Sequence, residues 1–253
     1  MQKNNLLSVW LFVGSFFTTS WLLCQSYRNP IIMDGDDNPA TGCRVNGTNA
    51  EFLRECSLHD GLHRNFSAII VGDNHNIAAC SIQTDLPYPD TLILIPVHLS
   101  CCSLDKERIA ETQAIMYYLE KNYSVWRKED TILRLPVVIT GDFNMVGSEI
   151  PYYNIITIQL TQAQKPWFTD LAPHQIDRPL AFTWRDYSKA FSPNRLDFIF
   201  YSPLLNAVYS FVFHLLYLNE NWLEKYGLNP LDLHFCSDHL QLVSDFALAA
   251  SPN

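Results

Sequence analysis

Four short segments of this chain carry acidic, amide or imidazole side chains at an end, and they limit how the chain can fold. Three contain an apolar run: Leu92–Ser100, Leu135–Asn144 and Arg195–Tyr201. The fourth is Cys236–Leu240. A short apolar run is typical of a buried strand, and a polar residue at its end lies where the chain leaves the core. We therefore expect one edge of a sheet to collect His98, Asp142, Asn144, Asp197, Asp238 and His239.

These residue types suit one kind of chemistry, the metal-assisted hydrolysis of a phosphoester. That reaction needs a neutralised phosphoryl group, an activated water and a proton for the leaving oxygen. Carboxylate oxygens bind Mg²⁺, Mn²⁺ or Ca²⁺, which supply positive charge, and an imidazole oriented by a carboxylate transfers protons near neutral pH. The six residues contain all of these parts.

The rest of the pattern predicts more strand than helix, and so an α/β (α+β) fold built on a mixed sheet with helical cover. A helix is expected at Asp105–Asn122, where apolar residues recur at helical spacing, and another at Glu220–Tyr226, ended by Gly227. A short helix at Ala50–Cys56 is also possible. Other strands are expected at Phe66–Val71 and Ile77–Gln83, which form a hairpin, and at Tyr152–Leu160, Phe168–Leu171, Phe182–Trp184, Phe211–Leu218 and Leu240–Phe246.

The N-terminal segment has a different composition. Lys3 precedes Leu6–Cys24, which holds no charged residue in 19 positions. This pattern predicts a signal peptide or membrane anchor at residues 1–24, with a buried core helix as the alternative. Residues 25–64 are turn-rich and are expected to form a linker or cap, and residues 65–250 form the main domain.

Two further features fit a secreted or membrane-anchored protein. Glycosylation sequons occur at Asn46, Asn65 and Asn122. Cys101 and Cys102 are adjacent, just after the His98 strand, where a disulfide could hold the loop in an oxidising compartment.

The charge balance bears on the substrate. The formal net charge is -9, with 26 acidic and 17 basic residues, and no cluster of Lys and Arg is present. Proteins that hold long nucleic acids usually present a basic surface. The balance therefore favours a small phosphoester or a phospholipid headgroup over long duplex DNA.

The motifs resemble those of the endonuclease/exonuclease/phosphatase superfamily, whose fold is that of DNase I. They are HLS at His98, GDFN at Gly141–Asn144, RLDFIFYS at Arg195–Ser202 and SDHL at Ser237–Leu240. The resemblance covers about residues 66 to 247 and includes FTWRD at Phe182–Asp186. In particular, the cysteine pair after the histidine resembles a bacterial, often exported branch. The resemblance implies a four-layer αββα sandwich and a Mg²⁺-dependent hydrolase, with Mn²⁺ or Ca²⁺ as alternatives.

The resemblance also implies roles in proton transfer. His239 would face the scissile phosphate, and Asp197 would fix its tautomer through a hydrogen bond. His98 would lie on the other side of the phosphate and stabilise charge or protonate the leaving group. Asp142 would orient or deprotonate the attacking water.

Other residues would bind the substrate and the metal. Asn144 would hold a phosphate oxygen, and His98 would contact the phosphate as well. Asp238 would lie at the metal together with Asp142. Arg195 would either support the phosphate pocket or form a structural pair.

The chain departs from the family pattern in its first part. Members normally carry an asparagine at the end of the first strand and a glutamate, the principal metal ligand, at the end of the second. Residues 25–97 contain neither motif, so the sandwich is expected to be incomplete there. Three explanations remain: a truncation, a noncatalytic binding protein on the same scaffold, or an enzyme with a substitute ligand such as Asp34, Asp36 or Asp37.

Overall fold

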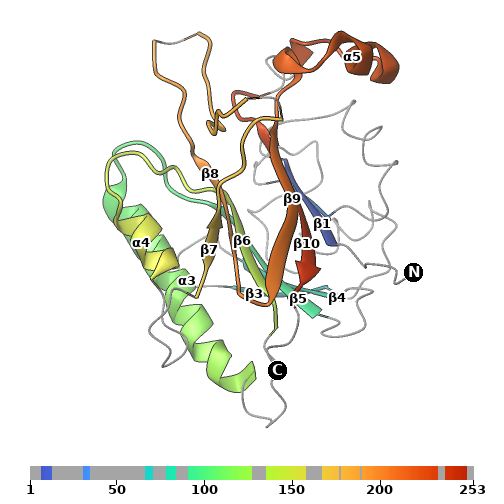
Figure 1. The fold of residues 1–253 in the computed structure, drawn as a ribbon. Helices are drawn as coiled ribbons and strands as arrows, with labels where there is room; N and C mark the ends of the chain where they lie inside the picture. Colours follow the sequence, from blue (N-terminus) through green and yellow to red (C-terminus); the bar gives the residue numbers. More distant parts are fainter. Residues whose placement is uncertain are drawn as a thin grey trace, which may run out of the picture.

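Two β-sheets form the body of the protein (Figure 1). The computed structural model describes residues 7–12, 31–34, 66–70, 78–83, 91–126, 135–157, 167–176, 178–188, 190–232 and 237–249, and before residue 92 it describes the backbone alone. One sheet has six strands in the order β3-β4-β5-β6-β8-β7, and the other has four in the order β2-β1-β10-β9.

The six-stranded sheet contains the apolar runs that the sequence singled out. Strands β3 and β4 form the expected antiparallel hairpin, β5 and β6 are parallel, and β8 is antiparallel to β6. The bounds are Phe66–Ile70 for β3, Ala78–Gln83 for β4, Thr91–His98 for β5, Val137–Asp142 for β6, Thr169–Leu171 for β7 and Asp197–Tyr201 for β8.

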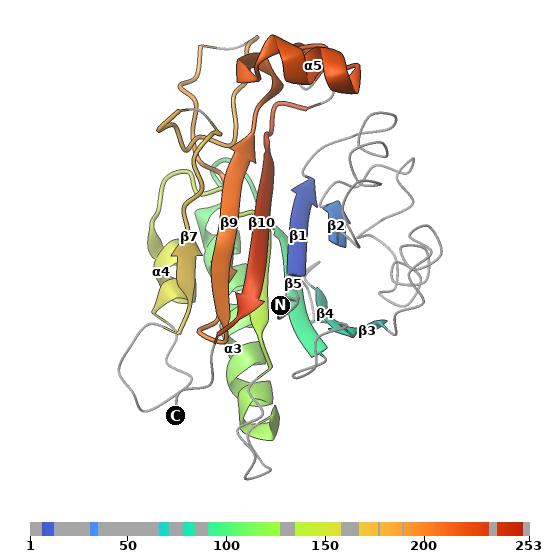
Figure 2. The same cartoon turned by 45° about the vertical axis from the view of Figure 1, so that its right-hand side comes forward.

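The central strands of this sheet are buried on both faces. Helices α3 (Asp105–Trp126) and α4 (Ile150–Ile156) cover one face, where Ile93 and Ile95 of β5 pack. Leu92 and Leu94 point the other way, into a core shared with the second sheet. Figure 2 looks onto the second sheet, with α3 partly hidden behind β9 and β10. Because both faces are covered, these strands are continuous apolar runs rather than alternating ones.

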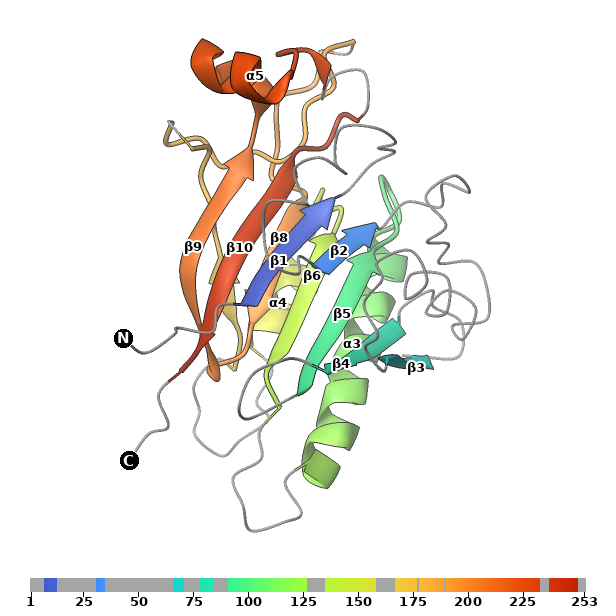
Figure 3. The ribbon, with the colours of Figure 1, turned by 90° about the vertical axis from the view of Figure 1, so that its right-hand side faces the viewer.

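The four-stranded sheet includes part of the hydrophobic N-terminal segment. Strand β1 (Leu7–Phe12) pairs antiparallel with β10 (Gln241–Leu248) and parallel with β2 (Ile31–Asp34). Strand β9 (Leu205–Phe213) completes this sheet beside β10. Figure 3 shows β1 and β2 next to β10. Six residues of the expected signal or anchor are therefore a strand, and the alternative of a core helix is wrong for them.

The structure corrects three other element boundaries. The strand expected at Tyr152–Leu160 is replaced by α4, because Pro151 occupies the start of a helix, where its missing N–H costs nothing. The strand expected at Phe211–Leu218 lies earlier, as β9, and is followed by a 3-10 turn at Leu215–Tyr217. Phe182–Trp184 forms only two isolated bridges, both at Trp184, to Asn194 and to His239.

Several expectations hold, and others fall outside the described residues. Helix α5 (Glu220–Tyr226) has the expected bounds, and Gly227 ends it in the left-handed conformation with φ 65°. The possible helix at residues 50–56 lies outside the described residues, as does most of the 25–64 linker. In the described part, the layers are helices, sheet and sheet, so the fourth layer stays a prediction. No helix in that part is long and apolar enough to cross a bilayer.

Candidate active site

Three neighbouring strands bring their polar ends to the same level of the six-stranded sheet. His98 is the last residue of β5 and pairs with Asp142, the last residue of β6. Asp142 in turn pairs with Asp197, the first residue of the antiparallel strand β8. His239 lies just before β10 and bridges to Trp184. The predicted convergence of these residues is confirmed.

Gly141 allows the ends of β5 and β6 to approach closely. Its φ is 141°, and a Cβ built on it would lie 1.9 Å from the carbonyl oxygen of Val97. No other residue fits this position without moving the backbone. The glycine of the GDFN motif therefore keeps His98 and Asp142 side by side.

Asp197 and His239 form a hydrogen-bonded pair. Oδ2 of Asp197 lies 2.9 Å from Nδ1 of His239, and the Asp197 side chain is fully buried. Thr183 fixes the backbone here, because its Oγ1 accepts the N–H groups of Leu196 at 3.0 Å and Asp197 at 2.9 Å. Burial lowers the pKa of His239, but its hydrogen bond to Asp197 and nearby negative charges outweigh burial and raise the pKa to about 9. His239 is therefore a cation at neutral pH.

Asp142 lies between the two imidazoles. Its Oδ2 is 3.7 Å from Nε2 of His98 and 3.7 Å from Nε2 of His239. Burial and the negative charge of Asp197 raise the pKa of Asp142 from 3.8 to about 6. At neutral pH the site thus contains a carboxylate with raised proton affinity beside a cationic imidazole, and such perturbed groups are typical of functional sites.

Asn144 closes the loop that follows β6. Its N–H donates to Oδ1 of Asp142 at 2.7 Å, and its Nδ2 donates to the carbonyl of Leu99 at 2.8 Å. Its φ is 47°, in the left-handed region that asparagine tolerates better than most residues. Asn144 therefore connects the loops after β5 and β6 and orients Asp142. The His98 side chain is half exposed, with 50% of its surface accessible, and can meet a ligand from solvent.

Two predicted site residues have partners that the sequence did not indicate. Oδ2 of Asp238 accepts a hydrogen bond from Nε1 of Trp184 at 2.7 Å. The guanidinium of Arg195 donates to both carboxylate oxygens of Asp170 and stacks over Phe198 at 4.1 Å. The structure thus shows the structural pairing of Arg195, and its substrate-binding role stays a prediction.

The donor set fits a metal ion only in part. Among the described residues, no group of three or more His, Cys, Asp and Glu side chains could hold a metal. Mg²⁺ usually needs only one or two carboxylates and takes its other ligands from water and substrate phosphate. Asp142 and Asp238 can supply two carboxylates. Oδ1 of Asp197 is also buried and lacks a hydrogen-bond partner within the described residues, so the site has capacity for a further donor or cation.

The end of strand β2, in the four-stranded sheet, lies level with the candidate site. Asp34 pairs with Phe12, the residue after Leu11, and Leu11 pairs with Leu242 near the start of β10. The backbone of Asp34 is therefore level with the chain just after His239. Asp36 and Asp37, the other suggested substitute ligands, lie outside the described residues.

Sequence reasoning missed a buried arginine that supports the site. Nη1 of Arg108 donates to the carbonyls of Ser100 at 2.8 Å and Cys102 at 3.1 Å, and Nη2 donates to Val146 at 2.6 Å and to Asp105. The side chain of Arg108 is fully buried. It therefore connects the loop that follows His98 with the loop that contains Asn144. One arginine among the charged residues at the start of a helix gives no signal of this role in one sequence.

The adjacent cysteines are free thiols. Sγ of Cys101 lies 2.7 Å from Sγ of Cys102, and both side chains are exposed. Their hydrogen bond, together with burial, raises the pKa of the Cys101 thiol. The disulfide suggested by the sequence is therefore not formed here, although the two thiols are in contact.

Comparisons with known proteins agree with this geometry. Residues 61–239 match the Endonuclease/Exonuclease/phosphatase family. Nocturnin of *Rattus norvegicus* and that of *Mus musculus* are each 32% identical over 123 residues, which is 47% of this chain and 26% of each relative. The match thus spans about a quarter of these relatives.

Two solved structures share the fold. *D. rerio* TDP2 complexed with single-strand DNA product has a TM-score of 0.54 at 13% identity and covers 96% of this chain and 99% of its own. A *Bacteroides thetaiotaomicron* endonuclease/exonuclease/phosphatase family protein has a TM-score of 0.54 at 11% identity, covering 97% and 99%. At these identities the likeness concerns the fold alone. The family match covers most of the chain and includes the residues that meet at the sheet edge, and the chain belongs to the endonuclease/exonuclease/phosphatase family.

Proposed function

We propose that this protein is a Mg²⁺-dependent phosphodiester hydrolase. The observation that carries the proposal is the placement of the Asp142 carboxylate between His98 and a His239 that Asp197 keeps protonated. This arrangement provides a base and a cation within one site. Family membership supports the reaction class, since the family's scaffold is that of a phosphoester hydrolase.

Asp142 is the proposed base. With a pKa of about 6 it is ionised at neutral pH, yet it accepts a proton more readily than an exposed carboxylate. It would take a proton from the attacking water as the water oxygen bonds to phosphorus. Asn144 would hold Asp142 in place through its N–H.

His239 is the proposed cation that faces the phosphate. Its Nδ1–H donates to Asp197, which leaves the Nε2–H directed toward the side of Asp142. The positive charge would stabilise the negative charge that develops on the phosphoryl oxygens. His98, half exposed on the other side of Asp142, would give a proton to the leaving oxygen as the bond from phosphorus to that oxygen breaks.

A bound Mg²⁺ would neutralise phosphate charge and polarise the phosphoryl group. Members of this family are generally Mg²⁺-dependent. Asp238 and Asp142 are the described residues proposed to hold the ion together with substrate phosphate, and Mn²⁺ or Ca²⁺ are the alternatives. The indole of Trp184 would keep the Asp238 carboxylate oriented.

The charge of -9 supports a small phosphoester or a phospholipid headgroup over long duplex DNA as substrate. The sequons and the hydrophobic segment support an extracytoplasmic location.

Hydrolysis of bis-p-nitrophenyl phosphate with Mg²⁺ tests the function. His239→Ala should lower kcat by at least about 100-fold, the usual contribution of a group that handles protons or charge in the transition state. His174→Ala is the matched control, because His174 is exposed and has no part in the proposed site. Equal rates for the unaltered protein and the His239→Ala variant would reject the proposal. The noncatalytic alternative would then gain support if Mg²⁺ also left the unfolding temperature unchanged.

A further inference from the structure

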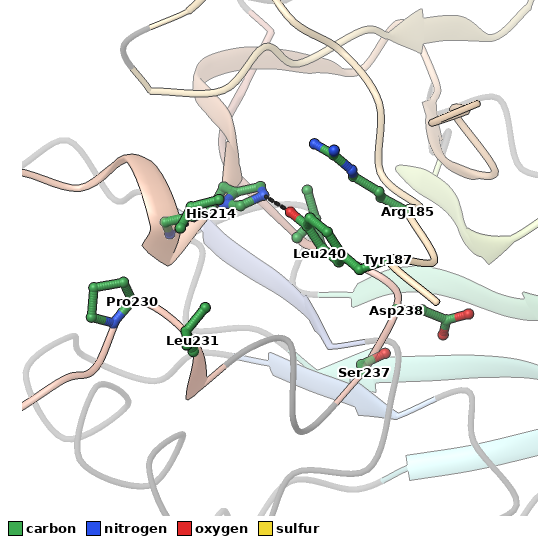
Figure 4. Close-up of a pocket in the computed structure, with 9 residues that line it drawn as sticks. Arg185, Tyr187, His214, Pro230, Leu231, Ser237, Asp238 and Leu240 are labelled. Carbon is green, nitrogen blue, oxygen red and sulfur yellow. Dashed lines mark hydrogen bonds between the residues drawn. The ribbon is translucent and has the colours of Figure 1, made fainter. Parts of the chain in front are cut away.

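A pocket of about 150 Å³ opens beside the Asp197–His239 pair (Figure 4). Asp238 and Leu240, the neighbours of His239 in the chain, both line it. Arg185 lines it as well, and its backbone N–H donates to the carbonyl of Asp238 at 2.8 Å. The pocket is thus built on the same backbone that positions His239.

Apolar side chains from separate parts of the chain gather in this pocket. Leu216 follows β9, Leu231 follows α5, and Tyr187 lies beyond Trp184. They are 39%, 47% and 42% exposed. Large side chains left accessible together in a concave site, with a few polar groups among them, are typical of a ligand pocket.

Hydrogen bonds and ring contacts fix the polar side of the pocket. The guanidinium of Arg185 lies over the ring of Tyr187, 4.3 Å from its centre. Nδ1 of His214 accepts from the N–H of Leu216 at 3.2 Å, so Nε2 of a neutral imidazole carries the proton and donates to the Tyr187 hydroxyl at 3.4 Å. Figure 4 shows this last contact. The wall therefore presents planar groups in a fixed arrangement.

The size of the pocket limits what it can hold. An apolar cavity of about this volume in another protein accommodates benzene. One planar ring therefore fits. The planar Arg185 and Tyr187 side chains favour a ring, which can stack on them, rather than a flexible chain.

We propose that this pocket binds a single planar ring carried by the substrate, next to the phosphate that His239 faces. The inference rests on the proposed function and names its substrate class, a phosphoester of a ring-bearing group. The ring is either a nucleobase or an aryl group, which share the same stacking chemistry.

Binding of phosphonates tests the pocket without any hydrolysis, because the bond between carbon and phosphorus stays intact. Calorimetric titration of the full chain with Mg²⁺ would compare phenylphosphonate with methylphosphonate, which differ only in the ring. We expect phenylphosphonate to bind at least about tenfold more tightly, as burial of one ring predicts. A uridine 5′-methylenephosphonate that binds more tightly than phenylphosphonate assigns a nucleotide, and weaker binding assigns an aryl ester.

Variants then locate the ring. Leu231→Trp and Leu216→Trp fill the pocket from different elements, and each should bring the two affinities to within about twofold. Val208→Trp is the control, because Val208 is 53% exposed on β9 and does not line the pocket. Equal binding of the two phosphonates to the unaltered protein overturns the inference, and so does a ring preference that survives both pocket variants. A ring preference without hydrolysis of bis-p-nitrophenyl phosphate would instead support the pocket and reject the proposed function.

Discussion

At the scale of single residues, the site depends on two groups whose pKa values are both raised. The pKa of Asp142 is about 6, and that of His239 is about 9. Between these values, the carboxylate is ionised while the imidazole keeps its proton. Burial and the negative charge of Asp197 raise the pKa of Asp142. Burial lowers the pKa of His239, but its hydrogen bond to Asp197 and the nearby carboxylate charges outweigh burial.

The pH dependence of kcat/KM should follow these two groups. Activity should rise as Asp142 loses its proton near pH 6 and fall as His239 loses its proton near pH 9. Asp197→Asn removes the partner that keeps His239 charged, so it should move the basic limb of the profile toward lower pH and lower kcat. A basic limb that stays in place in Asp197→Asn would show that another group titrates there.

Asp142→Asn should stabilise the protein while abolishing its activity. Folding raises the pKa of Asp142, so its ionisation lowers the free energy of unfolding as the pH rises from about 4 to 6. Above pH 6 this loss of stability is fully present. The uncharged variant should therefore gain about 1–3 kcal/mol in free energy of unfolding at pH 8 and nothing at pH 4. Urea unfolding at both pH values, without metal, measures this difference. If the variant is instead less stable at pH 8, the attraction of the imidazoles for the ionised Asp142 carboxylate outweighs the cost of burying that charge.

At the scale of elements, helix α3 supports the site through Arg108. Loss of its side chain would leave the carbonyls of Ser100, Cys102 and Val146 without their donor. Arg108→Met should therefore lower the free energy of unfolding by about 2–4 kcal/mol. It should also lower kcat, since the loops with His98 and Asn144 lose their common support.

The control for Arg108→Met is Lys106→Met, which removes the same charge from an exposed position on the same helix. That variant should change the free energy of unfolding by less than about 0.5 kcal/mol. If the two variants unfold at the same urea concentration with the same slope, the buried contacts of Arg108 do not support the loops as described.

A helix or strand could be predicted from the sequence when the residues that determine it lie close together in the chain. Helix α5 was predicted with its bounds because its stop signal, Gly227, directly follows it; the Asn219 cap that the structure shows at its start is equally local. The central strands were predicted because burial on both faces gives apolar runs. Helix α4 was not, because its aromatic and β-branched residues favour a strand, and packing against α3 decides the outcome.

The same distinction applies to the site. His98, Asp142 and Asp197 could be predicted to meet because each lies at the end of a strand. The pairing of Arg195 with Asp170 could not, since 25 residues separate them and either carboxylates or phosphate would satisfy a guanidinium. The contact of Trp184 with Asp238 spans 54 residues and likewise needs the fold.

At the scale of the whole molecule, the N-terminal segment shows how one sequence pattern can fit three different structures. An uncharged apolar run fits a signal peptide, an anchor or a strand inside a sheet, and composition does not separate them. The structure pairs β1 on both sides, with β10 and with β2. Strand β2 belongs to residues 25–97, where the family's metal-ligand motifs were not found, so this region supplies a strand that pairs with β1.

Removal of residues 1–24 should therefore destabilise the whole protein. Without β1, strand β10 becomes an unpaired edge and β2 loses its described partner. We expect the unfolding temperature to fall by about 10 °C or more, because a few kcal/mol shift it by several degrees in a domain of this size. Removal of residues 2–5, which precede β1, should change it little. If instead the chain without residues 1–24 unfolds cooperatively at the unaltered temperature, β1 contributes nothing to the fold, and the segment is better explained as the signal peptide or anchor that its composition predicts.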